Sequence, residues 1–157
     1  MLFRSRILVN GTRGKSSVTR LITGGLQSGN IRTLGKTTGT KPRFLYPDGS
    51  EHPIIRAGKA NIIEQLKVFR RAVEFQVKAL VTECMAVLPP NQIIMQNQLV
   101  RSNVGVITNV RNDHLDEMGP TLNDVAKCLA QTIPTNSILF TCERQYNLPL
   151  EEVRSEE

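Results

Sequence analysis

The sequence predicts an α/β fold in which helices cover both faces of a parallel sheet. Short apolar strand candidates alternate with helical patterns, and the strands are continuously apolar, which is typical of strands buried on both faces. A chain of 157 residues is long enough for one domain that buries roughly 70% of the surface of its unfolded chain. We expect this domain at residues 1–143 and an acidic, solvated C-terminal tail at residues 144–157.

The first half of the chain predicts two strands and one helix. The apolar run Ile7 to Val9 predicts a strand at residues 7–10, and helical spacing of apolar side chains predicts a helix at residues 16–27. A second strand is expected at residues 31–34. Residues 35–58 are rich in Gly and Pro, so we expect a loop or a small hairpin over the sheet edge.

The second half continues the alternation. Helical patterns occupy residues 61–77, 91–101 and 122–131, and apolar strand candidates lie at residues 79–83, 104–109 and 138–141. Each helical pattern thus separates two strand candidates, which favours crossover connections between parallel strands.

The segment VNGTRGKSS, residues 9–17, joins the first strand to the first helix. Its glycines permit close approach of backbone N–H groups to a ligand, Lys15 supplies a cation, and Ser16 can ligate a metal on a phosphate. The full P-loop pattern GxxxxGK[ST] wants a glycine where this chain has Val9, yet the setting of strand, turn and helix fits. We expect a nucleotide triphosphate here; the alternative is an ordinary turn with a solvated Lys15.

Polar residues also follow the third and fourth strands, at the edge where parallel sheets bind ligands. Glu83 ends the third strand, where P-loop enzymes keep the carboxylate that holds Mg²⁺; the alternative is a cap of the following segment. Asn109, Asp113, His114 and Asp116 follow the fourth strand. His114 between two acids could be a metal ligand, a general base, or part of a helix-capping turn.

Composition narrows the classes of protein. Residues 1–47 hold nine Lys and Arg and no acid, which predicts an anionic ligand larger than the phosphates alone. Nucleic-acid binding is not favoured, because aromatic residues make up 4% of the chain, Trp is absent, and no basic helix stands out. No apolar run approaches the roughly 20 residues of a membrane helix, and a secretory signal is not expected.

The cysteines Cys84, Cys128 and Cys142 are odd in number, widely spaced and without metal-ligand spacing. We expect free, buried thiols rather than disulfides or zinc ligands. This pattern is typical of a reducing compartment and predicts a cytoplasmic location.

Four segments, VNGTRGKSS, GKTTGT, ECMAV and NVRNDHLD followed by MGPTLNDVA, resemble in this order the central ATPase domain of the Mur ligase and folylpolyglutamate synthetase superfamily. They are most similar to its branch of bacterial poly-γ-glutamate (capsule) synthase ligases. The resemblance covers about residues 6–142 and implies a P-loop NTPase-like sheet of the Mur ligase central-domain type. In this superfamily the phosphate loop begins at the glycine of GTxGK, Gly11 here, which accounts for Val9. The domain would be incomplete, because family members continue beyond it.

The resemblance implies residue roles. Lys15 would contact the β- and γ-phosphates, and Lys15 and His114 would be catalytic. The nucleotide cradle would comprise Gly11, Thr12, Arg13, Gly14, Lys15, Ser16, Ser17 and Asn109. Magnesium would be held by Ser16 and Glu83 at a first site, and by His114 with Thr37 or Thr38 near a second. Many members also carry a carbamate-modified lysine, at whose position this chain has Leu129.

The implied reaction is ATP-dependent amide formation with ATP and Mg²⁺ as cofactors. A substrate carboxylate would attack the γ-phosphate to give an acyl phosphate and ADP, and a glutamate amine would displace phosphate. The implied partners are glutamate, poly-γ-glutamate, and either further copies of the chain or other synthase subunits at the inner face of the membrane. The alternatives are a nucleotide-binding module inactive without a partner chain or self-assembly, and a ligase of folylpolyglutamate or cell-wall precursors.

A basic group after the first helix is interpreted as attracting the polyanionic glutamate chain. It comprises Arg32, Lys36, Lys41 and Arg43. The alternative is a solvated surface with Lys36 alone near the metal.

Overall fold

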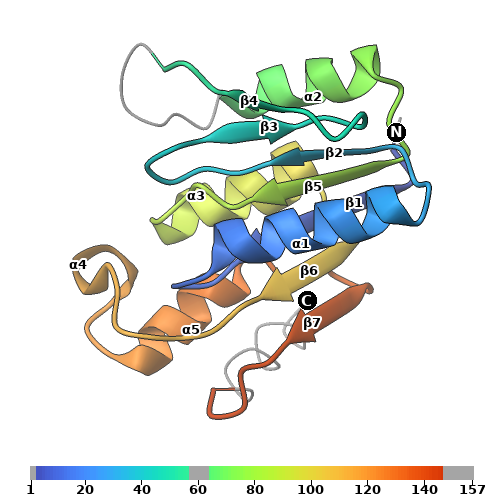
Figure 1. The fold of residues 1–157 in the computed structure, drawn as a ribbon. Coiled ribbons are helices and arrows are strands. Elements are labelled where there is room, and N and C mark those ends of the chain that lie inside the picture. Colours follow the sequence, from blue (N-terminus) through green and yellow to red (C-terminus); the bar gives the residue numbers. More distant parts are fainter. Residues whose placement is uncertain (1–2, 57–63, 147–157) are drawn as a thin grey trace.

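The structure, a computed structural model, describes residues 3–56 and 64–146. A seven-stranded sheet forms its centre, in the order β4-β3-β2-β5-β1-β6-β7 (Figure 1). The strands are β1 (Ser5–Asn10), β2 (Thr33–Lys36), β3 (Arg43–Leu45), β4 (Glu51–Pro53), β5 (Ala79–Glu83), β6 (Val104–Ile107) and β7 (Ile138–Thr141). Residues 147–157, most of the predicted tail, lie outside the described residues, so the tail stays a prediction.

The five predicted strands form the parallel part of the sheet. β1 pairs in parallel with β5 and β6, β2 with β5, and β6 with β7. The predicted hairpin is confirmed as β3 and β4, which pair antiparallel and extend the β2 edge. The sheet is therefore mixed, and the carboxyl ends of its five parallel strands share one edge.

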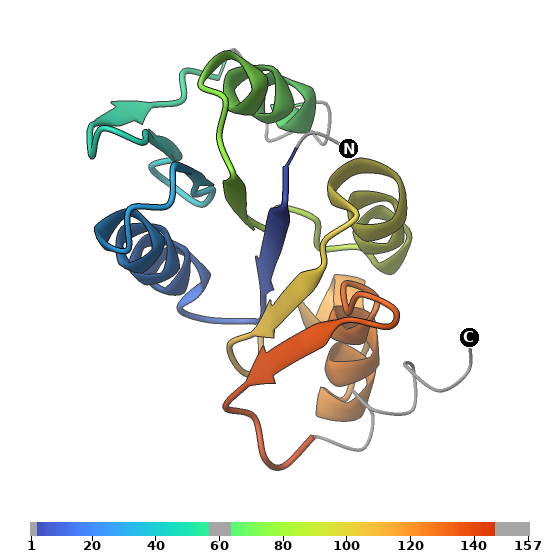
Figure 2. The same ribbon diagram turned by 90° about the vertical axis from the view of Figure 1, so that its right-hand side faces the viewer.

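Helices cover both faces, as predicted (Figure 2). They are α1 (Lys15–Ser28), α2 (Glu64–Glu74), α3 (Pro89–Ile94), the π-helix η1 (Met95–Val100), α4 (Leu115–Met118) and α5 (Leu122–Ala130). α1 packs on one face, where Ile22 meets Ile7 and Val9. α2, α3 with η1, and α5 lie on the other face, where Met95 packs against Leu8. The core thus consists of two layers separated by the sheet.

Several predicted boundaries are wrong by two or three residues. β2 begins at Thr33 because the chain leaves α1 through a left-handed Asn30, and a hydrogen bond from Ile31 N to Leu26 O holds residue 31 at the helix end. The helix predicted at 61–77 ends at Glu74, before a left-handed Gln76; residues 61–63 are not among those described. The helix predicted at 91–101 starts earlier, because Pro89 suits a first helical turn.

No helix in the described part of the chain is both long and apolar enough to span a membrane.

The cysteines differ in exposure. Cys84 and Cys128 are buried, but Cys142 is exposed just after β7, so the prediction of three buried thiols is wrong for Cys142. Residues 138 and 140–142 lie on an edge strand and its end with little packed over them, which short-range sequence pattern does not reveal. Burial raises the pKa of the Cys84 and Cys128 thiols to about 11.

Alkylation should therefore be selective. Iodoacetamide at mildly alkaline pH is expected to modify Cys142 and to leave Cys84 and Cys128 intact, because the thiolate is the reacting species. Mass spectrometry of tryptic peptides locates the adducts, and the unfolded chain, in which all three should react, is the control. Fast modification of Cys84 in the folded chain would contradict its burial.

Candidate active site

The loop between β1 and α1 has the backbone form of an anion site. Gly11 and Gly14 have φ values of 126° and 80°, in the region that L side chains rarely adopt, and Gly14 caps α1. Lys15 Nζ donates to Gly11 O at 2.7 Å and to Thr12 O at 3.2 Å, so the lysine folds back over its own loop. The first N–H groups of an α-helix have no partner within the helix, so the start of α1 supplies donors that suit an anion at this loop.

Asn109 braces this loop from the end of β6. Its Oδ1 accepts from Thr12 Oγ1 at 2.7 Å and from Arg13 N at 3.1 Å, and its Nδ2 donates to Arg13 O at 3.1 Å. Thr12 N also donates to Asn109 O. These contacts occupy the N–H groups of Thr12 and Arg13, so Asn109 sets the shape of the cradle. Whether any of the three contacts a nucleotide stays a prediction.

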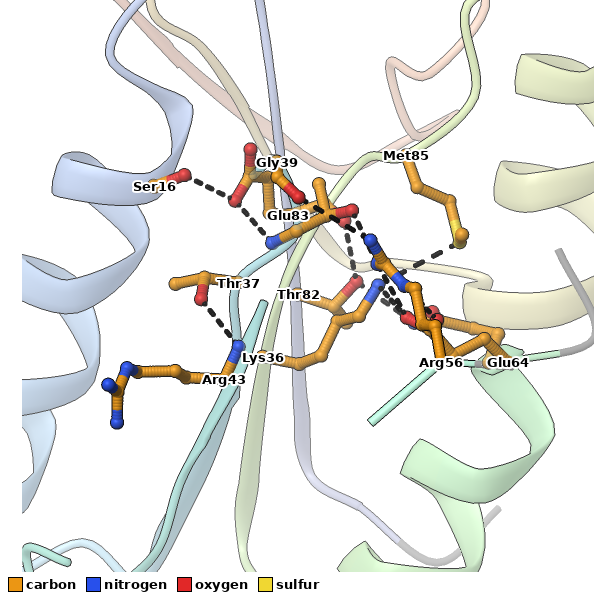
Figure 3. A network of polar contacts seen from close by, with 12 residues as sticks. Ser16, Lys36, Thr37, Gly39, Arg43, Arg56, Glu64, Thr82, Glu83 and Met85 are labelled. Atoms are coloured by element: carbon orange, nitrogen blue, oxygen red, sulfur yellow. Dashed lines mark hydrogen bonds and ion pairs between the residues drawn. The ribbon is translucent and has the colours of Figure 1, made fainter. Parts of the chain in front are cut away.

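A buried carboxylate lies on the other side of the loop. Glu83, 3% exposed, ends β5. Its Oε2 accepts from Ser16 Oγ at 2.8 Å and from Thr38 N at 2.7 Å (Figure 3). The structure thus brings together Ser16 at the start of α1, Thr38 in the loop after β2 and Glu83 at the end of β5. Thr38 was expected near the second metal with His114, whereas the structure places it beside Glu83. Thr37 differs from Thr38, because its Oγ1 accepts from Arg43 N at 3.1 Å and so faces β3.

The groups around Glu83 fit a magnesium ion bound beside phosphates. A carboxylate and a serine hydroxyl are hard oxygen donors, and Mg²⁺ takes one or two such protein ligands together with phosphate oxygens and water. Among the described residues no three of His, Cys, Asp and Glu gather as a ligand cluster. The hydrogen bonds that the Glu83 carboxylate accepts from Ser16 and Thr38 both go to its Oε2.

A second group of polar side chains, Lys36, Arg56 and Glu64, lies near Glu83, and sequence analysis did not predict their pairing. Glu64 Oε1 accepts from Lys36 Nζ at 3.0 Å, and Glu64 Oε2 from Arg56 Nε at 2.6 Å. Burial alone would raise the pKa of Glu64, but the hydrogen bonds and charges of Arg56 and Lys36 hold this pKa below its usual range. Burial lowers the pKa of the Lys36 ammonium. Charged side chains in this core escape any search for apolar periodicity.

The interpretation of the basic group as one surface is wrong for two of its members. Lys36 has a side chain 0% exposed, paired with Glu64. Arg32 precedes β2, at the opposite edge of the sheet from the phosphate loop. Arg43 Nε lies 3.9 Å from Glu51 Oε2, and Lys41 is exposed. Arg43 and Lys41 therefore remain as surface cations on the side of the hairpin.

His114 is the N-cap of α4, a helix that lies beyond the carboxyl end of β6 (Figure 1). The backbone of His114 has the left-handed conformation, with φ 49°. Its side chain is half exposed, and its Nδ1 lies 3.4 Å from Glu117 Oε2. Asp113 lies 4.0 Å from His114 Nε2 and 3.6 Å from Arg13 Nη2, which links His114 to the phosphate loop. Among the described contacts His114 makes none with Glu83 or Ser16. Its position is compatible with the predicted second metal site, which stays a prediction.

Glu143, which the sequence did not single out, orders the segment that leads to His114. This carboxylate is 6% exposed and accepts from Val110 N at 2.9 Å and Arg111 Nη1 at 3.1 Å. It also accepts from Arg144 N and Gln145 N at 3.0 Å. The ends of β6 and β7 are thereby tied together.

Leu129, which the resemblance aligns with the family's modified lysine, lies in α5 and is 0% exposed in an apolar cluster. It therefore offers no group to a second metal.

A cavity of about 360 Å³ adjoins the phosphate loop between α1, β6 and β7. Its lining includes the apolar side chains of Val18, Val106 and the half-exposed Phe140, together with Arg13 and Asn109. The cavity therefore combines apolar side chains with polar groups of the phosphate loop and of the segment after β6.

The sequence of this chain is similar to those of known proteins. The Mur ligase middle domain matches residues 9–137. Two curated relatives are 49% identical: capsule biosynthesis protein CapB of Bacillus anthracis, over 96% of this chain and 33% of the relative, and PGA synthase CapB of Bacillus subtilis (strain 168), over 90% and 36%. The chain thus spans about a third of the length of these relatives.

Solved structures show the same fold at low identity. The FPGS-AMPPCP complex has a TM-score of 0.66 at 20% identity, over 99% of this chain and 43% of that one. E. coli FolC in complex with ADP has a TM-score of 0.66 at 13% identity, over 99% of this chain and 42% of that one. The extent of the family match and the identity to the CapB proteins settle the assignment, and the chain belongs to the Mur ligase family, whose middle domain it contains.

Proposed function

We propose that this chain binds ATP with Mg²⁺ and carries the nucleotide site of an ATP-dependent amide ligase that adds glutamate to poly-γ-glutamate. The observation that carries the proposal is the contact of Ser16 and Thr38 with the buried Glu83 beside a glycine-rich loop. Support for the substrate comes from the 49% identity to the two CapB proteins, one named a PGA synthase. The neighbours titled as complexes with AMPPCP and ADP support a nucleotide at the loop.

In the proposed mechanism the protein positions charge rather than making covalent bonds. Lys15 would leave the Gly11 and Thr12 carbonyls to contact the β- and γ-phosphates, while the first turn of α1 donates N–H groups to them. Ser16 and Glu83 would hold Mg²⁺, and the ion would supply positive charge beside the phosphates. The γ-phosphoryl group would move to a substrate carboxylate with loss of ADP. The resulting acyl phosphate would react with a glutamate amine, releasing phosphate. The apolar cavity beside Phe140 suits the base of the nucleotide.

The remaining predictions join this proposal. His114 would act at a second metal, and Lys41 and Arg43 would attract the polymer from the hairpin side. We also propose a cytoplasmic location and assembly with further copies or with synthase subunits at the membrane.

The second candidate function is a nucleotide-binding module that turns over only after assembly with another polypeptide. The glycine-rich loop beside Glu83 supports nucleotide binding in either case, since its contacts involve no acceptor substrate. Purified chain should be incubated with ATP, Mg²⁺, glutamate and poly-γ-glutamate, with folylglutamate and cell-wall precursors as comparison acceptors. ADP release that depends on poly-γ-glutamate, with hydroxylamine trapping of an acyl phosphate, supports the ligase. ATP binding without ADP release supports the module.

Glu83→Gln is expected to weaken ATP binding in the presence of Mg²⁺ by about 10- to 100-fold and to leave binding in EDTA unchanged. The amide retains an oxygen that can accept from Ser16 and Thr38, so the local contacts persist while the charge that Mg²⁺ requires is lost. Calorimetric titration of ATP with and without Mg²⁺ measures both values.

Glu74→Gln is the matched control, because Glu74 is an exposed carboxylate that pairs with Arg71 at the far end of α2. It should behave as wild type. If Glu83→Gln retained the full effect of Mg²⁺ on ATP binding, Glu83 would not be a magnesium ligand.

A further inference from the structure

Two cations share one carboxylate behind the candidate metal site. Glu64 Oε1 accepts from Lys36 Nζ at 3.0 Å and from Arg56 Nη2 at 3.1 Å, and Glu64 Oε2 accepts from Arg56 Nε at 2.6 Å. The side chains of Lys36, Glu64 and Arg56 are 0%, 9% and 18% exposed. The group is thus largely withdrawn from water and carries one more positive than negative charge.

Both cations also lie within electrostatic reach of Glu83 (Figure 3). Arg56 is also connected to Glu83 through Thr38. Arg56 Nη2 donates to Thr38 Oγ1 at 3.1 Å, and Thr38 N donates to Glu83 Oε2 at 2.7 Å. Glu83 is therefore a second carboxylate that interacts electrostatically with Arg56 and is connected to it through Thr38. The guanidinium is always charged and suits carboxylates in a bidentate pair. A carboxylate paired with a guanidinium loses much of its attraction for a divalent cation.

We propose that Glu64 is a positioning residue of the metal site: it is the counter-ion that holds Arg56, and Lys36 behind it, away from Glu83, so that Glu83 stays available to Mg²⁺. This inference rests on the proposed function, because it takes Glu83 as a ligand of the Mg²⁺ that accompanies ATP. Arg56 is the cation that matters most, since its side chain is the more exposed of the two while Lys36 is enclosed.

The competition predicts an unusual pattern of variants. Glu64→Gln frees Arg56 to pair with Glu83, and the gain in ATP affinity on adding Mg²⁺ should fall about tenfold, while ATP affinity in EDTA is unchanged. Adding Arg56→Gln to Glu64→Gln removes the competitor and should restore the Mg²⁺ effect to within about threefold of wild type. A role confined to local packing would not be rescued by a second substitution in the same cluster.

The experiment is calorimetric titration of ATP, in EDTA and in saturating Mg²⁺, with thermal unfolding of each variant. Glu51→Gln is the matched control, because Glu51 also contacts two arginines, Arg20 and Arg43, but on the surface. Arg56→Gln alone keeps the buried pair of Lys36 with Glu64 and so remains informative if Glu64→Gln does not fold. It should show a Mg²⁺ effect equal to or larger than that of wild type.

The outcomes distinguish a failure of the proposed Mg²⁺ site from a failure of the role proposed for Glu64. A wild-type chain whose ATP binding gains nothing from Mg²⁺ overturns the proposed metal site and this inference with it. Where wild type shows the gain, an undiminished gain in folded Glu64→Gln overturns the inference alone, as does failure of Arg56→Gln to rescue it. A tenfold loss in Arg56→Gln by itself also overturns it, because Arg56 would then support the site through Thr38.

Discussion

Replacing Lys15 with alanine should weaken ATP binding about 100-fold and change the free energy of unfolding by no more than about 1 kcal/mol. The Lys15 ammonium would lose its contacts to the β- and γ-phosphates, which are charge-assisted hydrogen bonds. In the structure the Lys15 ammonium donates hydrogen bonds to the carbonyls of Gly11 and Thr12. These two residues are buried, while Lys15 itself is partly exposed, so water can enter the space that its side chain vacates and hydrogen-bond to the two carbonyls. ATP affinity and thermal unfolding should be measured on the same preparation.

Lys41→Ala is the matched control, because Lys41 is an exposed lysine within the same basic third of the chain. It should bind ATP like wild type, which separates the role of Lys15 from the loss of one positive charge. Wild-type affinity in Lys15→Ala would remove the nucleotide from this loop. Joint loss of ATP binding and of stability would instead assign Lys15 a structural role.

The parallel core was predictable because its strands are short apolar runs. β5 and β7 have the predicted bounds, since each begins with a continuous run of apolar residues directly after a polar residue. The hairpin was predictable from turn residues, as PDGS lies between β3 and β4. The ends of helices and strands were less predictable where a residue with a left-handed backbone, such as Asn30 or Gln76, follows a helix. Such conformations depend on local packing that sequence pattern does not report.

The candidate active site also has a part that the sequence predicts and a part that it does not. Ser16 and Glu83 are 67 residues apart, yet their contact could be expected, because both follow parallel strands and must share one edge. The pairing of Glu64 with Lys36 and Arg56 could not be expected, because charge in a sequence indicates a solvated surface by default. Only the crossing of α2 over the end of β2 reveals that these charges neutralise one another away from water.

Gly11→Ala is the substitution expected to damage the fold most among those considered. A Cβ at Gly11 would lie 2.1 Å from Thr108 Oγ1 and 2.9 Å from the backbone N of Thr108. The side chain could rotate away, but the backbone N belongs to the end of β6, where it donates to Asn10 O at 2.9 Å. The φ of 126° adds strain that alanine cannot relieve without moving the loop.

We therefore expect Gly11→Ala to destabilise the chain by about 3 kcal/mol, a fall of roughly 6–12 °C in Tm for a domain of this size. Its residual folded fraction should bind ATP weakly, because the loop must shift away from Thr108 and Asn109 to admit the methyl group. Gly25→Ala is the matched control, since Gly25 lies in α1 and a Cβ there meets nothing within 4 Å. It should stabilise the chain by about 0.5–1 kcal/mol, because alanine favours a helix interior. Opposite shifts in Tm from one added methyl group would establish that Gly11 is required by the close approach of the phosphate loop to β6, and equal shifts would refute it.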